Sequence, residues 1–393
     1  MMGPSSVNSR ARMRQRKTSS AQCSNCATHH DSPITTASQP PTRFGAFRTM
    51  ASPSTKRPWI MPVADPDWIS QYQEAAIDPD VRIIDAHHHL WVLPNQTYLV
   101  PDFLADAGGG HHIEASVYME GSMAYRGDGP EEMRSVGETE FAHAAAIETN
   151  ARVSTGIVAF ANLRTSTNLE AILSAHIDAG GGRLRGIRDI LAWDPDIELR
   201  DPRIDPEEHA MDMPAFRDSL RLLGTHDLVF DVWLYFTQLK KLAEVARDVP
   251  ETRIVINHFG GPLGVGGYRN RRDEVIAVWN DGLKALSACP NVYMKIGGLA
   301  GRWAGLGFHE LAKPPSSEVM AKAWLPYVEP TIEAFGAARC MFESNFPVDA
   351  ETCSYVTLWN TFKRVARRYS SAEREALFRG TAIQVYRLNL PEA

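Results

Sequence analysis

The sequence predicts a single (β/α)8 barrel, and three observations support this fold class. Short β-branched runs alternate with longer amphipathic runs from about residue 59 onward, a pattern typical of βαβ units around a parallel sheet. About eight such units follow one another, and this number favours closure into a barrel. No glycine-rich dinucleotide fingerprint follows the first strand, which counts against the alternative of an open, doubly wound sheet.

The expected strands are short and apolar, and the expected helices follow them in turn. The strands are predicted at residues 82–86, 113–120, 155–162, 184–190, 228–235, 253–257, 292–296 and 339–343. The helices are predicted at residues 131–149, 168–179, 213–223, 238–248, 273–287, 318–335, 356–365 and 371–387. Because catalytic groups of such a barrel lie at the carboxyl ends of the strands, polar residues there are candidates for a site.

Residues 1–58 differ in composition from residues 59–393, which we assign to the barrel domain. Arginines lie among Ser, Thr and Gln near the start, and the first acidic residue is Asp31. Such a segment buries too little apolar surface to fold, so we expect a disordered basic tail or an over-extended gene start. The same composition is typical of a transit peptide, so a mitochondrial or other organellar location stands as the alternative to the cytoplasm.

Bulk properties exclude several classes of partner. The net charge of −6 and the lack of a clustered basic patch in the globular part argue against nucleic-acid binding. No run approaches the ~20 apolar residues that a membrane-spanning helix needs. Five scattered cysteines do not form a disulfide framework, which indicates a reducing compartment. We expect a small-molecule substrate as partner, and the sequence leaves a homo-oligomer open.

Histidines follow two of the predicted strands. Strand alternation after the first strand directs His87 and His89 to one side and His88 to the other. Two imidazoles placed in this way can share a metal ion or a substrate oxygen; the alternative is a solvent-exposed histidine run. His258 ends the sixth strand before a glycine loop. Alone it could be a packing residue, but together with the first pair it indicates a site.

The eighth strand ends with a carboxylate and an amide on one face. Glu343 and Asn345 are two residues apart, and at a barrel mouth they could supply a base and an orienting donor. The alternative is that Glu343 forms an ion pair with a nearby Arg or Lys.

Further polar and aromatic residues on the strands are candidates for substrate binding. An arginine fork suits a carboxylate, so we expect a substrate with an acidic group. The alternative for the arginines is a structural ion pair, with Asp189, Asp231 or Glu120 as the partner. The candidates are Arg185, Arg188, Trp233, Tyr235 and Lys295.

These motifs together resemble the amidohydrolase-related family, in the branch that contains sugar-acid lactonases and the pyrone-dicarboxylate lactonase. The resemblance runs from about residue 83 to residue 388. The matching pieces are Ile84-Asp85-Ala86-His87-His88-His89-Leu90-Trp91, Arg185-Gly186-Ile187-Arg188, Asn257-His258-Phe259-Gly260-Gly261-Pro262, Lys295-Ile296-Gly297-Gly298-Leu299 and Phe342-Glu343-Ser344-Asn345-Phe346-Pro347-Val348.

The resemblance implies roles for the histidines and exposes one departure. His87, His89 and His258 match the family's first-strand and sixth-strand histidines. Asn345 falls where the family has an aspartate that activates the attacking water and ligates the metal. Asn is a poor base. We therefore expect Glu343 to be the base, with the histidines as alternative bases.

The resemblance also bears on the metal. The fifth strand lacks the histidine ligand frequent in the superfamily, and members of the lactonase branch work without a metal. We expect either no required metal or a weakly held zinc ion, with His87, His89 and His258 as the ligands that the sequence leaves open.

The leading functional hypothesis is hydrolysis of a small, oxygen-rich substrate, most simply a lactone or similar carboxylic ester. A base-activated water attacks the carbonyl, histidines polarise its oxygen, and Arg188 holds an acidic group. The first alternative is a metal-dependent decarboxylase of an aromatic or dienoic acid, against which Asn345 counts. The second is a catalytically weak barrel that binds a small ligand.

Overall fold

The computed structural model describes residues 63, 65–164, 167–201, 203–204 and 206–390. The expected tail, residues 1–58, lies outside these described residues. All described residues belong to one compact unit. Within this part of the chain, no helix is long and apolar enough to cross a membrane.

The main sheet contains eight parallel strands in the order β1-β4-β5-β6-β7-β8-β9-β10. Their bounds are Arg82–His88, His112–Met119, Gly156–Phe160, Leu184–Ile190, Val229–Trp233, Ile254–Ile256, Val292–Ile296 and Cys340–Phe342. The first and last strands meet just beyond their ends, where the His89 amide donates to the Phe346 carbonyl at 2.8 Å and the Asn345 amide to the His87 carbonyl at 2.9 Å. The predicted (β/α)8 barrel is thus confirmed.

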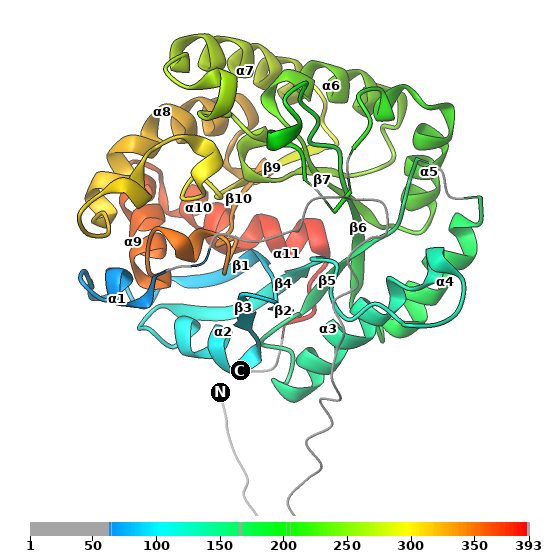
Figure 1. Ribbon diagram of the computed structural model, residues 1–393, viewed down its shortest axis with the longest axis horizontal. Helices are drawn as coiled ribbons and strands as arrows, with labels where there is room; N and C mark the ends of the chain where they lie inside the picture. The colour runs from blue at the N-terminus through cyan, green and yellow to red at the C-terminus, as the bar shows by residue number, and fades with distance from the viewer. Residues whose placement is uncertain (1–62, 64, 165–166, 202, 205, 391–393) are drawn as a thin grey trace, which may run out of the picture. The chain divides into compact units, whose positions relative to one another are not determined.

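Most helices lie around the outside of the strands, whereas α11 lies across the middle of the ring (Figure 1). The helices are α1 (Pro66–Ile69), α2 (Val100–Ala107), α3 (Val136–Glu148), α4 (Leu169–Ala179), α5 (Pro214–Thr225), α6 (Leu239–Asp248), α7 (Arg272–Ser287), α8 (Ser317–Phe335), α9 (Tyr355–Val365), α10 (Ser371–Glu375) and α11 (Thr381–Tyr386). A small antiparallel hairpin, β2 (Trp91–Leu93) and β3 (Gln96–Tyr98), follows β1 and was not predicted, because strands of three residues carry almost no periodic signal.

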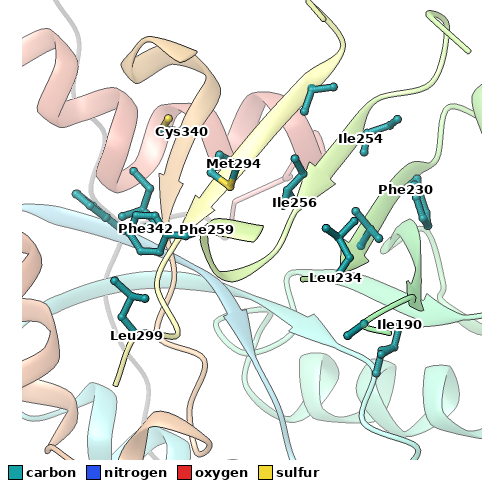
Figure 2. Close-up of a cluster of buried hydrophobic side chains, with 14 of the residues drawn as sticks. Ile190, Phe230, Leu234, Ile254, Ile256, Phe259, Met294, Leu299, Cys340 and Phe342 are labelled. Atoms are coloured by element: carbon teal, nitrogen blue, oxygen red, sulfur yellow. The ribbon is translucent and has the colours of Figure 1, made fainter. Parts of the chain in front are cut away.

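Two apolar layers hold the barrel together. The outward faces of the strands, including Phe230 and Phe342 (Figure 2), pack against the helices. Phe230 contacts Phe216 of α5 and Phe342 contacts Phe362 of α9, with ring centroids 5.6 and 4.6 Å apart. The inward faces form a second cluster with Val385 of α11. Burying both faces of a parallel sheet explains why the strands read as continuous apolar runs.

Each predicted strand overlaps an observed one, but β8 and β10 end earlier than expected. Beyond their ends, His258 and Asn345 have φ angles of 52° and 54°, in the left-handed region. The chain therefore turns at His258 and Asn345, which are themselves two of the candidate site residues.

An irregularity in β1 positions the first histidines. Pairing with β4 shifts register between Asp85 and His88, and inserting a residue in this way re-aims the side chains that follow. Ile84 and Ala86 pack in the interior cluster, and His87 nevertheless reaches the interior site described below. His88 faces outward, onto the Ser116 hydroxyl at 3.0 Å.

Candidate active site

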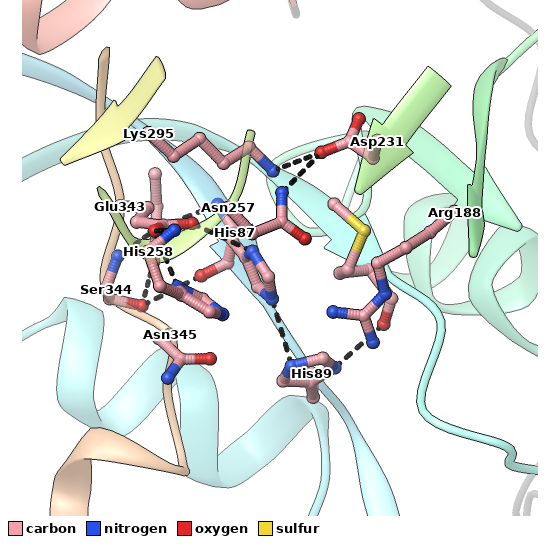
Figure 3. Close-up of polar contacts among 12 residues, drawn as sticks. His87, His89, Arg188, Asp231, Asn257, His258, Lys295, Glu343, Ser344 and Asn345 are labelled. Carbon is pink, nitrogen blue, oxygen red and sulfur yellow. Dashed lines mark hydrogen bonds and ion pairs between the residues drawn. The ribbon is translucent and has the colours of Figure 1, made fainter. Parts of the chain in front are cut away.

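Histidines from two strand ends converge with the end of β10 at one mouth of the barrel (Figure 3). His87 Nε2 lies 3.0 Å from His89 Nε2, and the His87 and His258 ring centroids are 4.7 Å apart. As alternation predicted, His87 and His89 face one side and His88 the other. Figure 3 also shows Glu343 and Asn345 beside His258.

Glu343 lies between two of the histidines. Its Oε1 accepts hydrogen bonds from the His258 backbone N–H at 3.0 Å and from His258 Nδ1 at 2.7 Å. Its Oε2 lies 2.8 Å from His87 Nδ1, and its side chain is fully buried. Both carboxylate oxygens therefore face imidazole nitrogens. Glu343 is therefore placed to orient the two rings.

The protons in this chain of contacts can be assigned one by one. Burial lowers the pKa values of both His87 and His89 well below their usual range, with Lys295 the next cause for His87 and Arg188 for His89. The His89 Nδ1 lies 2.9 Å from the Met119 carbonyl, which only accepts, so this nitrogen carries the hydrogen. His89 Nε2 then accepts, and His87 Nε2 must donate to it.

This assignment leaves a conflict at the other nitrogen of His87. A neutral His87 that carries its hydrogen on Nε2 presents a lone pair at Nδ1 to Glu343 Oε2, and these two buried atoms form no hydrogen bond. One additional positive charge removes the conflict. It would be either a proton shared by His87 and Glu343, or a metal cation held by the histidines in place of the Nε2 hydrogen.

The donor set fits a divalent metal. With the Nε2 atoms of His87 and His89 as ligands, each Nδ1–H has an acceptor in place: the Met119 carbonyl for His89 and Glu343 for His87. Such carboxylate–histidine pairs support metal ligands in many proteins. One potential ligand atom from each of His87, His258 and Glu343 also lies within 4.8 Å of the other two. Because Glu343 faces the Nδ1 atoms, we assign it to orienting the ligands.

Asn345 presents its amide oxygen to the site. Its Nδ2 donates to the buried Asp349 carboxylate at 2.8 Å, which turns the oxygen toward the histidines (Figure 3). Asn is among the residues that tolerate the left-handed backbone found here.

A charged layer lies deeper in the barrel. Lys295 Nζ is 2.9 Å from Asp231 Oδ1, and the same carboxylate accepts from Asn257 Nδ2 at 2.8 Å and from the Tyr386 hydroxyl. The Lys295 and Asp231 side chains are fully buried. Lys295 was expected to bind substrate, but its ammonium is directed to Asp231 in the interior.

The two arginines of β6 have different environments. Arg188 Nε donates to the Glu120 carboxylate at 2.7 Å and Nη2 to the Glu120 carbonyl at 2.5 Å, so Arg188 braces the end of β4 beside His89. Arg185 Nη1 donates to the Gly182 and Leu184 carbonyls at the start of β6. The structure therefore does not bring Arg185 to the site. Position along the strand could have shown this, because Arg185 is the second residue of β6 and Arg188 lies nearer to the carboxyl end, where the site of a barrel is found.

Aromatic rings border the mouth. Trp233 contacts the His258 ring edge-on at a centroid distance of 4.8 Å, and Trp303 contacts Trp233 at 5.2 Å. Trp91 stacks on His89 at 5.3 Å. Tyr235 donates its hydroxyl to the Leu199 carbonyl and so anchors a loop.

Several of the residues that complete the site were missed by sequence reasoning. Trp303 lies in a glycine-rich loop without periodicity, and Asp349 lies beyond the last strand, so neither carries a local signal. Trp91 stood inside a quoted motif, directly after the histidines, and its place in the sequence could have drawn attention to it. Arg203, bound to Asp201 at 2.5 Å, also belongs here, since it contributes to the lowered pKa of His89.

A barrel with histidines after its first and sixth strands and an acid after its eighth defines the class of this protein: it is a hydrolase of the amidohydrolase superfamily. The amidohydrolase family model matches residues 84–388, and the chain belongs to that family.

Relatives cover most of the chain. An uncharacterised protein of Sinorhizobium fredii is 31% identical over 79% of this chain and 99% of its own length. The L-fucono-1,5-lactonase of Burkholderia multivorans is 27% identical over 78% of this chain and 97% of its own. A crystal structure of a Burkholderia multivorans amidohydrolase with bound zinc is 24% identical, with a TM-score of 0.62, over 79% of this chain and all of that one.

Proposed function

We propose that this protein hydrolyses a lactone, with His258 as the general base. The observation that carries the proposal is the Glu343–His258 pair. His258 Nδ1 donates to Glu343, so a neutral His258 ring presents an unprotonated Nε2 to the site. A histidine oriented by a buried carboxylate is a recurrent design for removing a proton from a nucleophile. Glu343 is thus a positioning residue, and the base role expected of it passes to a histidine.

The reaction follows from this arrangement. His258 Nε2 takes a proton from water while the water oxygen attacks the lactone carbonyl carbon. The Nε2–H of His87, which donates to His89 Nε2 in the absence of substrate, would turn to the carbonyl oxygen and stabilise the developing oxyanion. When the tetrahedral intermediate collapses, the ring C–O bond breaks and the alkoxide takes the proton back from His258. The product is a hydroxy acid.

The Nε2 atoms of His87 and His89 would hold a divalent metal, which when bound would polarise the carbonyl as a Lewis acid. With the metal bound, the Met119 carbonyl and Glu343 would accept from the Nδ1–H groups of the two rings; without it, a proton shared by His87 and Glu343 would take its place. The general base and its orienting carboxylate do not depend on the cation.

The charges favour a neutral substrate. Arg188 is paired with Glu120, Arg203 with Asp201, and Lys295 with Asp231. An acidic group on the substrate would compete with these acids, so the acidic substrate expected from the arginines is not part of the proposal. Trp233 and Trp303 offer flat apolar faces to a ring bearing hydroxyl groups. The L-fucono-1,5-lactonase relative supports a sugar lactone.

The test is turnover of a lactone panel, followed by proton release, with neutral sugar lactones beside lactones that carry a carboxylate. We expect ring opening of the neutral members, and a loss of about 10²-fold or more in His258→Gln. Comparable melting temperatures of the two proteins are the control for folding. Absence of turnover on every lactone, with decarboxylation of an aromatic acid instead, would overturn the proposal.

A further inference from the structure

Asp349 is a buried acid that the proposed reaction does not use. It follows β10 by a few residues, and its side chain is completely enclosed. Its Oδ1 accepts from Asn345 Nδ2 at 2.8 Å, and its Oδ2 accepts from the Ala300 backbone N–H at 3.3 Å. Its backbone N–H donates to the Asn345 carbonyl at 3.2 Å, so Asp349 is fixed against the loops after both β9 and β10.

These contacts decide which end of the Asn345 amide faces the site. A side-chain amide has a donor end and an acceptor end, and a carboxylate accepts only. Asp349 therefore takes the NH2 group, and the oxygen must point the other way. Figure 3 shows that this is the direction of the histidines. Without Asp349, nothing in these contacts would distinguish the two orientations of the amide.

We propose that Asp349 is a positioning residue, which holds the Asn345 amide so that its oxygen accepts a hydrogen bond from the attacking water. This rests on the proposed function. The water has two hydrogens: His258 Nε2 removes one, and Asn345 Oδ1 binds the other and fixes the direction of the remaining lone pairs. A neutral acceptor suffices for this purpose, since the base is His258.

The pair also explains why an aspartate does not fit at position 345 in this chain. Burial raises the pKa of Asp349 well above its usual range, so in Asn345→Asp the two carboxyl groups at the present 2.8 Å contact would have to share a proton or repel each other, and either outcome replaces a satisfied amide–carboxyl hydrogen bond. Reversing the pair restores the hydrogen bond. In the double variant Asn345→Asp/Asp349→Asn, the new amide donates and the new carboxylate accepts, while the second carboxylate oxygen faces the histidines.

The experiment is a double-mutant cycle on the full chain, with thermal unfolding as the first readout. We expect Asn345→Asp to lower Tm by roughly 5 °C or more, Asp349→Asn to lower it less, and the double variant to return to within about 2 °C of the wild type. Additive effects of the two substitutions, or a stable Asn345→Asp variant, would overturn the pairing. This readout needs no substrate, so it stands apart from the proposed function.

Turnover of a lactone accepted by the wild type is the second readout. Asp349→Asn should lower kcat by about tenfold with KM nearly unchanged, because the substitution disturbs the orientation of the attacking water but not the binding of the substrate. The double variant should recover most of kcat. Recovery of Tm without recovery of kcat would make the pair merely structural and overturn the role in turnover. If the cycle shows coupling but the wild type opens no lactone, the proposed function fails while the pairing holds.

Discussion

At the scale of single residues, one buried acid of the site contacts more than one histidine. One carboxylate, Glu343, contacts both His87 and His258 and accepts the Nδ1 hydrogen of the His258 ring. Because both imidazole rings contact Glu343, this carboxylate affects two histidines, whereas an acid facing water would act on the water alone. The chemistry of His258 is therefore determined by a residue that substrate does not touch.

The first prediction concerns Glu343→Gln. The amide can accept from only one of the two histidines and would direct its NH2 group at the other, so at least one ring loses its orientation. We expect kcat to fall by about 10²-fold or more, with a smaller change in KM. Glu351→Gln is the matched control, since Glu351 is a buried acid bound to the Arg302 backbone and not to a histidine. Unchanged kcat in Glu343→Gln would remove its positioning role.

The second prediction concerns Asp85, whose carboxylate accepts from the Ser344 amide at 2.9 Å and from its hydroxyl at 2.6 Å. Burial raises the pKa of Asp85 from 3.8 to about 6, although the Ser344 and Tyr355 hydrogen bonds oppose the rise. Between these two values the folded state binds more protons than the unfolded state. The free energy of unfolding should therefore fall as pH rises from about 4 to about 6, by up to about 3 kcal/mol.

Asp85→Asn should remove this contribution. Urea unfolding of both proteins between pH 4 and 7 measures it: the stability difference between wild type and variant should change across pH 4 to 6 and level off above. Two parallel curves over that range would show that Asp85 does not titrate there.

At the scale of elements, position along β6 separates two arginines that the sequence had grouped. Arg188 lies in the interior and holds both the side chain and the carbonyl of Glu120 at the end of β4. The adjacent Met119 carbonyl is the acceptor for His89. Arg185 lies at the opposite end of the strand, bound to backbone carbonyls.

The third prediction compares the same substitution at Arg188 and at Arg185, and Arg185 is the control. Arg188→Lys keeps the charge but loses the planar fork, so the end of β4 and the His89 ring should lose their fixed geometry. We expect kcat/KM on a lactone to fall by roughly 10-fold or more. Arg185→Lys, the same exchange on the same strand, should leave kcat/KM unchanged. Equal losses in the two variants would contradict the division of β6 into a site end and a remote end.

At the scale of the whole molecule, closure of the barrel brings β1 and β10 side by side and so joins the two ends of the sequence at one site. The interior beneath is charged but paired, with Lys295 held by Asp231. The barrel thus presents histidines above a layer of paired charges, and the donor set of these histidines fits a divalent metal.

The fourth prediction concerns that metal. Metal-free protein should bind about one equivalent of zinc in a calorimetric titration, weakly, and His87→Ala or His89→Ala should abolish binding. His88→Ala is the control, because His88 faces Ser116 on the outer side. Chelation should leave turnover intact, since His258 and Glu343 complete the base without a cation. One tightly held equivalent with chelator-sensitive turnover would reverse this expectation and favour the decarboxylase.

The sequence by itself determined the barrel, the order of its strands and the three histidines, because alternation of apolar runs and residues at strand ends are local patterns. It also identified Asn345 as a departure. The tertiary structure decided which of these residues meet: Glu343 reaches His258 across 85 positions of chain, and the register shift in β1 turns His87 inward. Such contacts depend on how separate strands are staggered. That stagger is fixed by packing of the whole barrel, and no single segment encodes it.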